Sequence, residues 1–267
     1  MKRKFIIVLS IIVLIIQLIM PIIGYAYEEI DSEADIGTET KTKSFFDSSI
    51  TFSWQSFKNN EGLVDYGMCI PSNANEYEEI PLILWLHGWF TASESGNLNV
   101  DSISTKATGI PYAVLGGSSL ENFSAYILCP KFPGNSVNQW WDPQEIQQLL
   151  DKILEEYNVD RDNVVIVGHS FGGGNTWKIA NALPSYFSKA VICSGYFDGS
   201  TLLPMPTQWY VGTGDNSSAL SNAQSYENLI NAKAANYEKN TLYRISCGHG
   251  TPIVAYNKDD GTCGRNS

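Results

Sequence analysis

Residues 163–173, Asn-Val-Val-Ile-Val-Gly-His-Ser-Phe-Gly-Gly, decide the fold of this 267-residue chain. The apolar, β-branched run at 163–167 predicts a buried strand, and it leads without a break into a Gly-x-Ser-x-Gly pattern. Between a strand and a helix, this pattern predicts a sharp turn that holds Ser170 in a strained backbone conformation with its hydroxyl above the sheet. Gly168 and Gly172 are needed because a Cβ at either position would clash in so tight a turn.

Further strand-like runs lie on both sides of this segment. Residues 50–57 and 63–70 have strand composition and could form an antiparallel pair. Nearly continuous apolar runs then follow, as expected for strands that are covered on both faces, at residues 81–86, 125–129, 163–167, 190–193, 208–211 and 241–245.

Three helices are predicted between these strands, at residues 143–157, 171–183 and 219–237. The first has apolar residues at spacings of three and four, with Asp142 as N-cap, Pro143 at the first position and Glu145 completing a capping box. Alternating strands and helices predict a single α/β domain with a mainly parallel sheet. In such sheets the functional residues lie at the carboxyl ends of the strands.

The first 26 residues have the three-part layout of a secretory signal peptide. Three basic residues at 2–4 precede an apolar run at 5–23, and Gly24-Tyr25-Ala26 supplies a small-x-small cleavage pattern. We expect cleavage after Ala26 and a secreted protein, and the alternative is a retained N-terminal membrane anchor. Residues 27–44 carry six acidic residues and are expected to form a flexible lead-in. The catalytic domain is then expected at residues 45–267.

Charge and composition exclude several classes of function. The chain has 17 basic and 28 acidic residues, which disfavours a nucleic-acid partner and, once the signal is cleaved, a membrane partner. With three histidines and no Cys-x-x-Cys pair, neither a metal site nor another cofactor is expected. Five cysteines are present. We expect Cys69, Cys129 and Cys193 to be buried as small hydrophobic residues, while Cys247 and Cys263 could form a disulfide.

A serine hydroxyl is a weak nucleophile at neutral pH and needs a neighbouring base. Hydrolases with this turn have the order nucleophile, acid, histidine along the chain, and His249 is the only histidine after Ser170. The side chain of His169 is expected to point away from the serine hydroxyl. His87 is expected to order the loop after residues 81–86 by hydrogen bonding.

The acid is expected at a strand end between Ser170 and His249. Asp215 follows the strand at 208–211 in a glycine-rich loop, and we favour it over Asp198, which follows the strand at 190–193. The N–H groups of Phe171 and Trp89 are the expected oxyanion-hole donors.

With these residues in place, the chain resembles the α/β-hydrolase fold over nearly all of residues 45–267. The likeness rests on PLILWLHGW, AYILCPKF, VGTGD and the long segment from WWDPQEIQQ to GHSFGGGNTWKIA. Within that fold it resembles secreted esterases of the feruloyl-esterase and polyhydroxybutyrate-depolymerase type, and related predicted peptidases. The resemblance implies a Ser–Asp–His triad acting through an acyl-enzyme, and it assigns these roles to Ser170, Asp215 and His249.

Aromatic residues gather near the predicted strand ends, and we expect substrate contacts from Phe90, Trp140, Trp141, Tyr196 and Phe197. Trp89-Phe90 is bulkier than the glycine-rich segment of many relatives. Aromatic walls suit an aromatic acyl group or a sugar face, so the expected partner is a small-molecule or polysaccharide-linked ester. Alternatively, Trp140 and Trp141 pack beneath the sheet ends. The function hypotheses are a secreted serine esterase, a serine peptidase of the same fold, and a non-catalytic surface-binding protein on a hydrolase scaffold.

Overall fold

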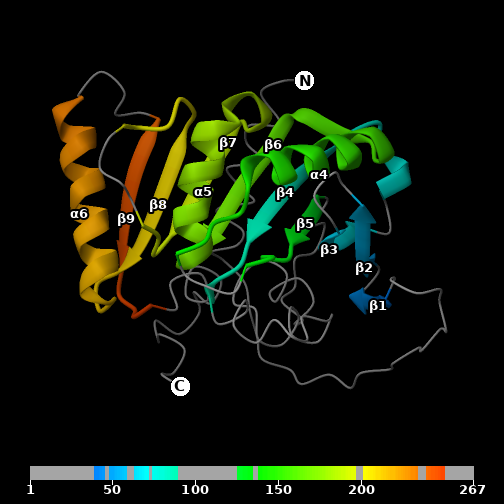
Figure 1. Ribbon diagram of the computed structural model, residues 1–267, viewed down its shortest axis with the longest axis horizontal. Coiled ribbons are helices and arrows are strands. Elements are labelled where there is room, and N and C mark those ends of the chain that lie inside the picture. The colour runs from blue at the N-terminus through cyan, green and yellow to red at the C-terminus, as the bar shows by residue number, and fades with distance from the viewer. Residues whose placement is uncertain are drawn as a thin grey trace.

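A mixed β-sheet with helices packed against it forms the centre of the molecule (Figure 1). The structure is a computed structural model, and it describes residues 39–45, 48–58, 63–71, 74–89, 125–134, 138–196, 201–233 and 239–249. The signal peptide expected at residues 1–26 lies outside these ranges. Within them, no helix has both the length and the apolar composition needed to cross a bilayer.

Nine strands of the described chain make one sheet, in the order β1-β2-β3-β5-β4-β6-β7-β8-β9. The pairs from β1 to β3 and the β3–β5 pair are antiparallel, and all other pairs are parallel. The carboxyl ends of β4, β6, β7, β8 and β9 therefore meet at one edge of the sheet (Figure 1). The strands are β1 Glu39–Phe45, β2 Ser48–Lys58, β3 Leu63–Pro71, β4 Ile80–Leu86, β5 Tyr126–Pro130, β6 Val159–His169, β7 Lys189–Cys193, β8 Thr207–Gly212 and β9 Asn240–Ile245.

The first strand corrects one expectation. Residues 39–44, predicted to belong to a flexible lead-in, instead form most of β1, which pairs antiparallel with β2. The segment is polar, with the sequence ETKTKSF. An edge strand tolerates such a sequence, since threonine favours extended backbone and lysine on an edge opposes pairing with other chains. The antiparallel pairing of β2 with β3 agrees with the prediction.

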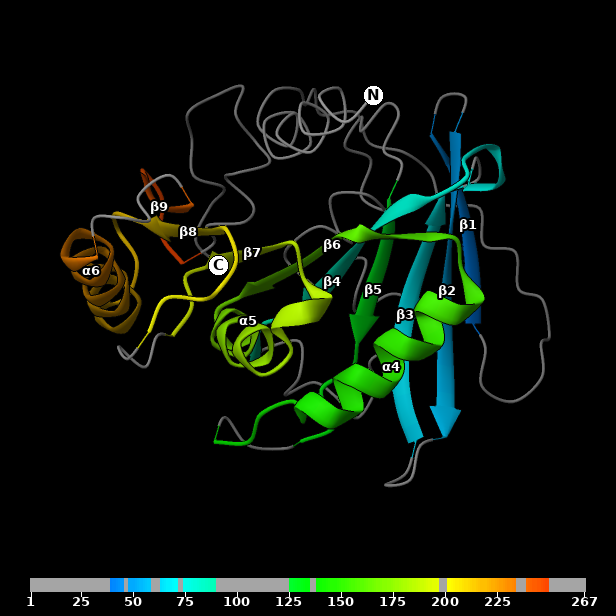
Figure 2. The same cartoon turned by 90° about the horizontal axis from the view of Figure 1, so that it is seen from above.

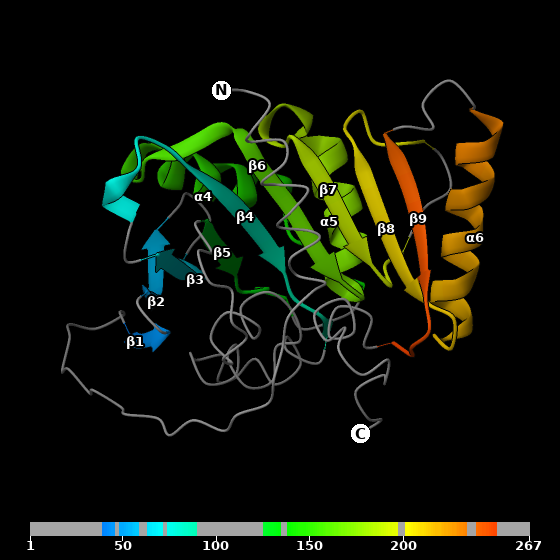
Figure 3. The ribbon, with the colours of Figure 1, turned by 180° about the vertical axis from the view of Figure 1, so that it is seen from behind.

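Three helices pack against one face of the sheet, as seen from above in Figure 2. They are α4 Pro143–Glu156, α5 Phe171–Ala182 and α6 Ser217–Ala232. Two short helices also occur, η1 Ala74–Glu76 between β3 and β4 and η4 Pro184–Tyr186 between α5 and β7. The predicted cap of α4 is confirmed, since the Asp142 carboxylate accepts a hydrogen bond from the Gln144 N–H at 2.8 Å. Helix α6 lies beside β8 and β9 (Figure 3). It ends earlier than predicted because the backbone of Lys233 leaves the helical region.

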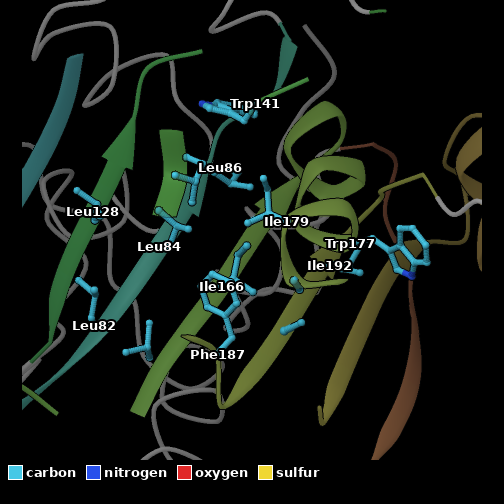
Figure 4. Close-up of a cluster of buried hydrophobic side chains, with 14 of the residues drawn as sticks. Leu82, Leu84, Leu86, Leu128, Trp141, Ile166, Trp177, Ile179, Phe187 and Ile192 are labelled. Carbon is cyan, nitrogen blue, oxygen red and sulfur yellow. The ribbon is translucent and has the colours of Figure 1, made fainter. Parts of the chain in front are cut away.

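Alternate residues of the central strands pack beneath these helices. Leu82, Leu84 and Leu86 form a row along β4, with Trp141 beyond the carboxyl end of the row (Figure 4). The intervening residues Ile83 and Trp85 are also buried, so β4 is covered on both faces, as its continuous apolar run predicts. Cys69, Cys129 and Cys193 are buried in the sheet as expected, while the partner considered for Cys247, Cys263, lies outside the described residues.

The amino-terminal turn of α5 touches the backbone of β4. A Cβ added to Gly172 would lie 2.0 Å from the Leu86 carbonyl oxygen. A Cβ on Gly168 would lie 2.3 Å from the Gly172 carbonyl oxygen and 2.4 Å from Thr176 Oγ1. These separations are far below van der Waals contact, so only glycine lets β6 turn this tightly into α5.

This close contact makes Gly172 the most demanding glycine of the turn. We expect Gly172→Ala to lower the free energy of unfolding by more than about 3 kcal/mol, or to prevent folding, because backbone must move to admit the methyl group. Chemical denaturation followed by tryptophan fluorescence measures this change. Gly248→Ala is the matched control, since its new Cβ has its nearest neighbour at 3.8 Å. Equal stability of the two variants would contradict the packing argument.

Candidate active site

Ser170 lies between β6 and α5 with backbone angles of φ 56° and ψ −115°. A positive φ is strained for any residue that carries a Cβ. Hydrogen bonds on both sides hold the turn, since Ser170 N–H donates to the Cys193 carbonyl at 2.9 Å and Gly174 N–H donates to the Ser170 carbonyl at 3.1 Å. The serine is thereby fixed at the carboxyl edge of the sheet, at the positive end of the α5 dipole.

The structure brings His249 and Asp215 to this serine. His249 Nε2 lies 2.8 Å from Ser170 Oγ, and His249 Nδ1 lies 2.7 Å from Asp215 Oδ1. An ionised carboxylate only accepts hydrogen bonds, so the imidazole proton belongs on Nδ1 and Nε2 is left to accept the serine proton. The three residues follow β6, β8 and β9, and the side chain of Asp215 is fully buried.

Hydrogen-bond donors lie against both oxygens of the Asp215 carboxylate. Besides the His249 contact, Oδ1 accepts the Asn216 N–H at 2.7 Å and Oδ2 accepts the Ser194 hydroxyl at 2.5 Å. Burial alone would raise the pKa of Asp215, but the hydrogen bonds from His249, Ser194 and Asn216 outweigh it and hold this pKa below its usual value. The carboxylate therefore stays ionised at neutral pH.

The other two histidines are buried and neutral. Burial lowers the pKa of His87 to about 4 and that of His169 to about 4. His87 orders its loop as expected, since Nδ1 donates to the Gly88 carbonyl at 3.0 Å and Nε2 accepts the Phe132 N–H at 3.2 Å. His169 Nε2 donates to the main-chain carbonyl of His249 at 2.7 Å. The His169 side chain therefore binds the loop that carries His249 and not the serine hydroxyl.

Trp89 and Phe171 lie side by side next to the serine. Their rings meet edge to face, with centroids 5.4 Å apart. Gly88 also lies close to the serine, because a Cβ added to Gly88 would lie 3.9 Å from the Ser170 Cβ. The loop after β4 and the first residue of α5 therefore border the same serine, from two separate segments of the chain.

Two of the aromatic residues predicted to contact substrate are exposed near the serine. Trp140 is 38% exposed and Tyr196 is 46% exposed. Both flank Gly174 in α5, since a Cβ on this glycine would meet Trp140 at 3.3 Å and Tyr196 at 3.2 Å. Trp140 also stacks on Phe171 at 6.0 Å between centroids. The other predicted contacts, Phe90 and Phe197, lie outside the described residues, as does Asp198.

Trp141 corrects the expectation of a substrate contact. It is only 2% exposed, and its ring packs against Phe132 at 4.9 Å and against His87 at 5.0 Å. Its main-chain N–H donates to Asn175 Oδ1 at 3.0 Å. The ring packs into the hydrophobic core at the carboxyl end of β4 (Figure 4), which is the packing role considered as the alternative.

Two contacts around the site were not foreseen from the sequence, namely those of Ser194 with Asp215 and of His169 with the His249 loop. Ser194 directly follows β7. Its strand-end position is the one signal that could have identified it, and serines are common in such loops. Among the described residues, no group of three or more His, Cys, Asp or Glu side chains is arranged to hold a metal ion.

Comparisons with known proteins agree with this architecture. The chain resembles a thermostable esterase (23% identity, 77% of this chain and 60% of that chain, TM-score 0.62) and an S-formylglutathione hydrolase from Agrobacterium tumefaciens (14% identity, 82% and 95%, TM-score 0.57). The chain has the α/β-hydrolase fold. A third α/β-hydrolase neighbour is a feruloyl esterase module from Clostridium thermocellum complexed with sinapinate (13% identity, 81% and 90%, TM-score 0.55).

Sequence comparison gives a narrower match. The model of the prolyl oligopeptidase family, a peptidase family, matches residues 135–250, which is less than half of the chain. That range includes the Ser170 turn, Asp215 and His249 of the α/β-hydrolase domain. No curated protein sequence matches the chain.

The two buried histidines predict an acid-sensitive stability. An unfolded histidine has a pKa near 6.5, above the folded value of about 4, so between these values the unfolded chain binds more protons. The free energy of unfolding should therefore fall as the pH drops from about 6.5 to about 4. Chemical denaturation of the wild type and of His87→Gln at pH 7 and pH 4.5 isolates one histidine. We expect the wild type to lose roughly 2 kcal/mol more than the variant; equal losses would refute a neutral, buried His87.

Proposed function

We propose that the protein is a secreted serine hydrolase that cleaves carboxylic esters through an acyl-enzyme. One observation carries the proposal: the continuous chain of hydrogen bonds from Ser170 Oγ to His249 Nε2 at 2.8 Å and from His249 Nδ1 to Asp215 Oδ1 at 2.7 Å. A nucleophile, a base and a group that orients the base are the parts that acyl transfer requires.

The proposed reaction starts with transfer of the Ser170 proton to His249 Nε2 as Oγ attacks the ester carbonyl carbon. Asp215 stabilises the resulting imidazolium and keeps Nδ1 protonated. The tetrahedral intermediate carries a negative oxygen, and the N–H groups of Phe171 and Trp89 are the proposed donors to it. When the intermediate collapses, the C–O bond to the alcohol breaks and the imidazolium gives its proton to the departing alcohol. Water then attacks the acyl-enzyme by the same route and releases the acid.

The proposed substrate is a small-molecule or polysaccharide-linked ester with an aromatic acyl group or a sugar near the scissile bond. Exposed Trp140 and Tyr196 support it, since they offer flat apolar surfaces close to Ser170. The sequence also predicts substrate contacts from Phe90 and Phe197, which lie outside the described residues. The likeness to a feruloyl esterase module complexed with sinapinate points in the same direction.

A serine peptidase is the second candidate, and the match to the prolyl oligopeptidase family favours it. Peptide and ester cleavage share the acyl-enzyme route, and they differ in the leaving group that His249 must protonate. The same purified protein can therefore be tested on both substrate classes.

Export is part of the proposal. The basic residues at 2–4, the apolar run at 5–23 and the small residues at 24–26 support a cleaved signal peptide, with a retained N-terminal anchor as the alternative. The acidic balance of 28 acidic against 17 basic residues suits a protein that acts away from anionic surfaces.

Removing the nucleophile tests the reaction. We expect Ser170→Ala to lower kcat/KM on a short acyl ester by at least about a thousandfold while the circular dichroism spectrum is unchanged. An organophosphonate should label the wild type and not this variant. Ser188→Ala is the matched control and should keep full activity. Ser188 directly precedes β7, at the opposite end of this strand from the site, and its Oγ donates to the Val164 carbonyl. Absence of both turnover and labelling in the wild type would favour a non-catalytic binding protein.

A substrate panel tests the aromatic wall. We expect Trp140→Ala to lower kcat/KM about tenfold on a hydroxycinnamate ester and less than about twofold on an acetate ester, since only the aromatic acyl group can stack on the indole. Tyr77→Ala is the matched control, as Tyr77 is 45% exposed but precedes β4 at the opposite edge of the sheet. Equal losses on both esters would exclude the stacking role, and release of peptides without ester cleavage would favour the peptidase.

A further inference from the structure

Ser170 and Ser194 occupy equivalent places on neighbouring strands. In the parallel pair of β6 and β7, His169 lies opposite Cys193, and each of these residues is followed by a serine. Ser170 has φ 56° and Ser194 has φ 48°, and within the described ranges no other non-glycine residue has a positive φ. A positive φ, which is unfavourable for a residue with a Cβ, therefore occurs twice at one level of the sheet.

The backbone around Ser194 is closely held. Its N–H donates to the Tyr210 carbonyl of β8 at 2.8 Å. The next residue, Gly195, is packed so tightly that an added Cβ would lie 2.6 Å from Ile192 Cγ2 and 2.8 Å from the Gly173 carbonyl carbon. Strain of this kind persists only where the surrounding structure enforces it, and it is found mainly at functional sites.

The strained backbone directs the Ser194 hydroxyl to the acid of the proposed triad. Ser194 is 2% exposed, and its Oγ donates to Asp215 Oδ2 at 2.5 Å. The other carboxylate oxygen, Oδ1, accepts hydrogen bonds from His249 Nδ1 and from the Asn216 N–H. The terminal torsion of an aspartate has a broad energy minimum, so the carboxylate plane needs a partner on each oxygen to stay fixed.

We propose that Ser194 is a positioning residue that fixes the rotation of the Asp215 carboxylate, so that Oδ1 faces His249 Nδ1. The proposal rests on the serine-hydrolase function argued above. Because Ser194 is buried behind Asp215, it has no access to substrate. Loss of its hydroxyl should therefore slow the chemical step and leave substrate binding unchanged.

Two substitutions separate the hydroxyl from the backbone strain. Ser194→Gly removes the hydroxyl and adopts a φ of 48° without strain, whereas Ser194→Ala removes the hydroxyl and keeps the strain. We expect kcat to fall roughly tenfold to a hundredfold in both variants, with KM within about twofold of the wild type. The melting temperature should be higher for the glycine variant than for the alanine variant.

A merely structural role predicts a different result. Activity would then follow stability, and Ser194→Gly would be about as active as the wild type, which would overturn the proposal. Ser188→Ala is the control, because Ser188 directly precedes β7 while Ser194 directly follows it, and Ser188 is remote from Asp215. It should keep the wild-type kcat.

A readout that does not depend on turnover completes the test. In proton NMR, the His249 Nδ1–H in its hydrogen bond to Asp215 should give a far-downfield signal, assigned by its absence in His249→Gln. We expect the signal to persist in Ser188→Ala and to move upfield or broaden beyond detection in both Ser194 variants. An unchanged signal in those variants would refute the positioning role. If the wild type cleaves no ester, the proposed function fails, while the NMR comparison still decides the role of Ser194.

Discussion

The contact between the backbone of α5 and the backbone of β4 is the constraint on which the rest of the site depends. A Cβ added to Gly172 would lie only 2.0 Å from the Leu86 carbonyl oxygen, so no side chain fits between the helix and the strand. The chain must therefore turn sharply after β6, and Ser170 takes the positive φ that the turn requires. The same contact brings the end of β4, with Gly88 and Trp89, against the serine. One packing requirement thus sets both the backbone conformation of Ser170 and the position of the neighbouring loop.

Parallel strand order then brings the remaining groups together. Ser170, Ser194, Asp215 and His249 follow β6, β7, β8 and β9, which are consecutive in the sheet. Adjacent strands are about 4.8 Å apart, so the His249 loop must cross back over the ends of β8 and β7 to reach Ser170. The glycine at the end of β8 allows this crossing, since a Cβ on Gly212 would lie 2.3 Å from the Gly248 carbonyl oxygen. The hydrogen bond from His169 to the His249 carbonyl holds the loop at its far side.

The sequence could predict those parts of this arrangement that local patterns specify. Continuous apolar runs located the central strands because both faces of each strand are buried, and the glycines at 168 and 172 located the turn. The polar strand β1 could not be found this way, since its pairing with β2 uses backbone groups that every sequence has. Adjacent Trp140 and Trp141 show a second limit. One indole is exposed and the other buried, and the difference depends on which ring faces Phe132 and His87, residues distant in sequence.

The contact of Ser194 with Asp215 joins residues 21 positions apart, and the strand-end position of Ser194 does not by itself reveal its partner. It does, however, belong to a consistent distribution of charge. The proposed reaction places a transient positive charge on His249, whose ring centroid is 5.0 Å from that of His169. A second imidazolium at that distance would oppose the reaction, and burial prevents it by lowering the pKa of His169 to about 4. The Asp215 carboxylate, ionised and held by donors on both oxygens, faces the His249 ring. The three histidines of the chain thus lie at the same end of the parallel strands, where burial keeps His87 and His169 neutral.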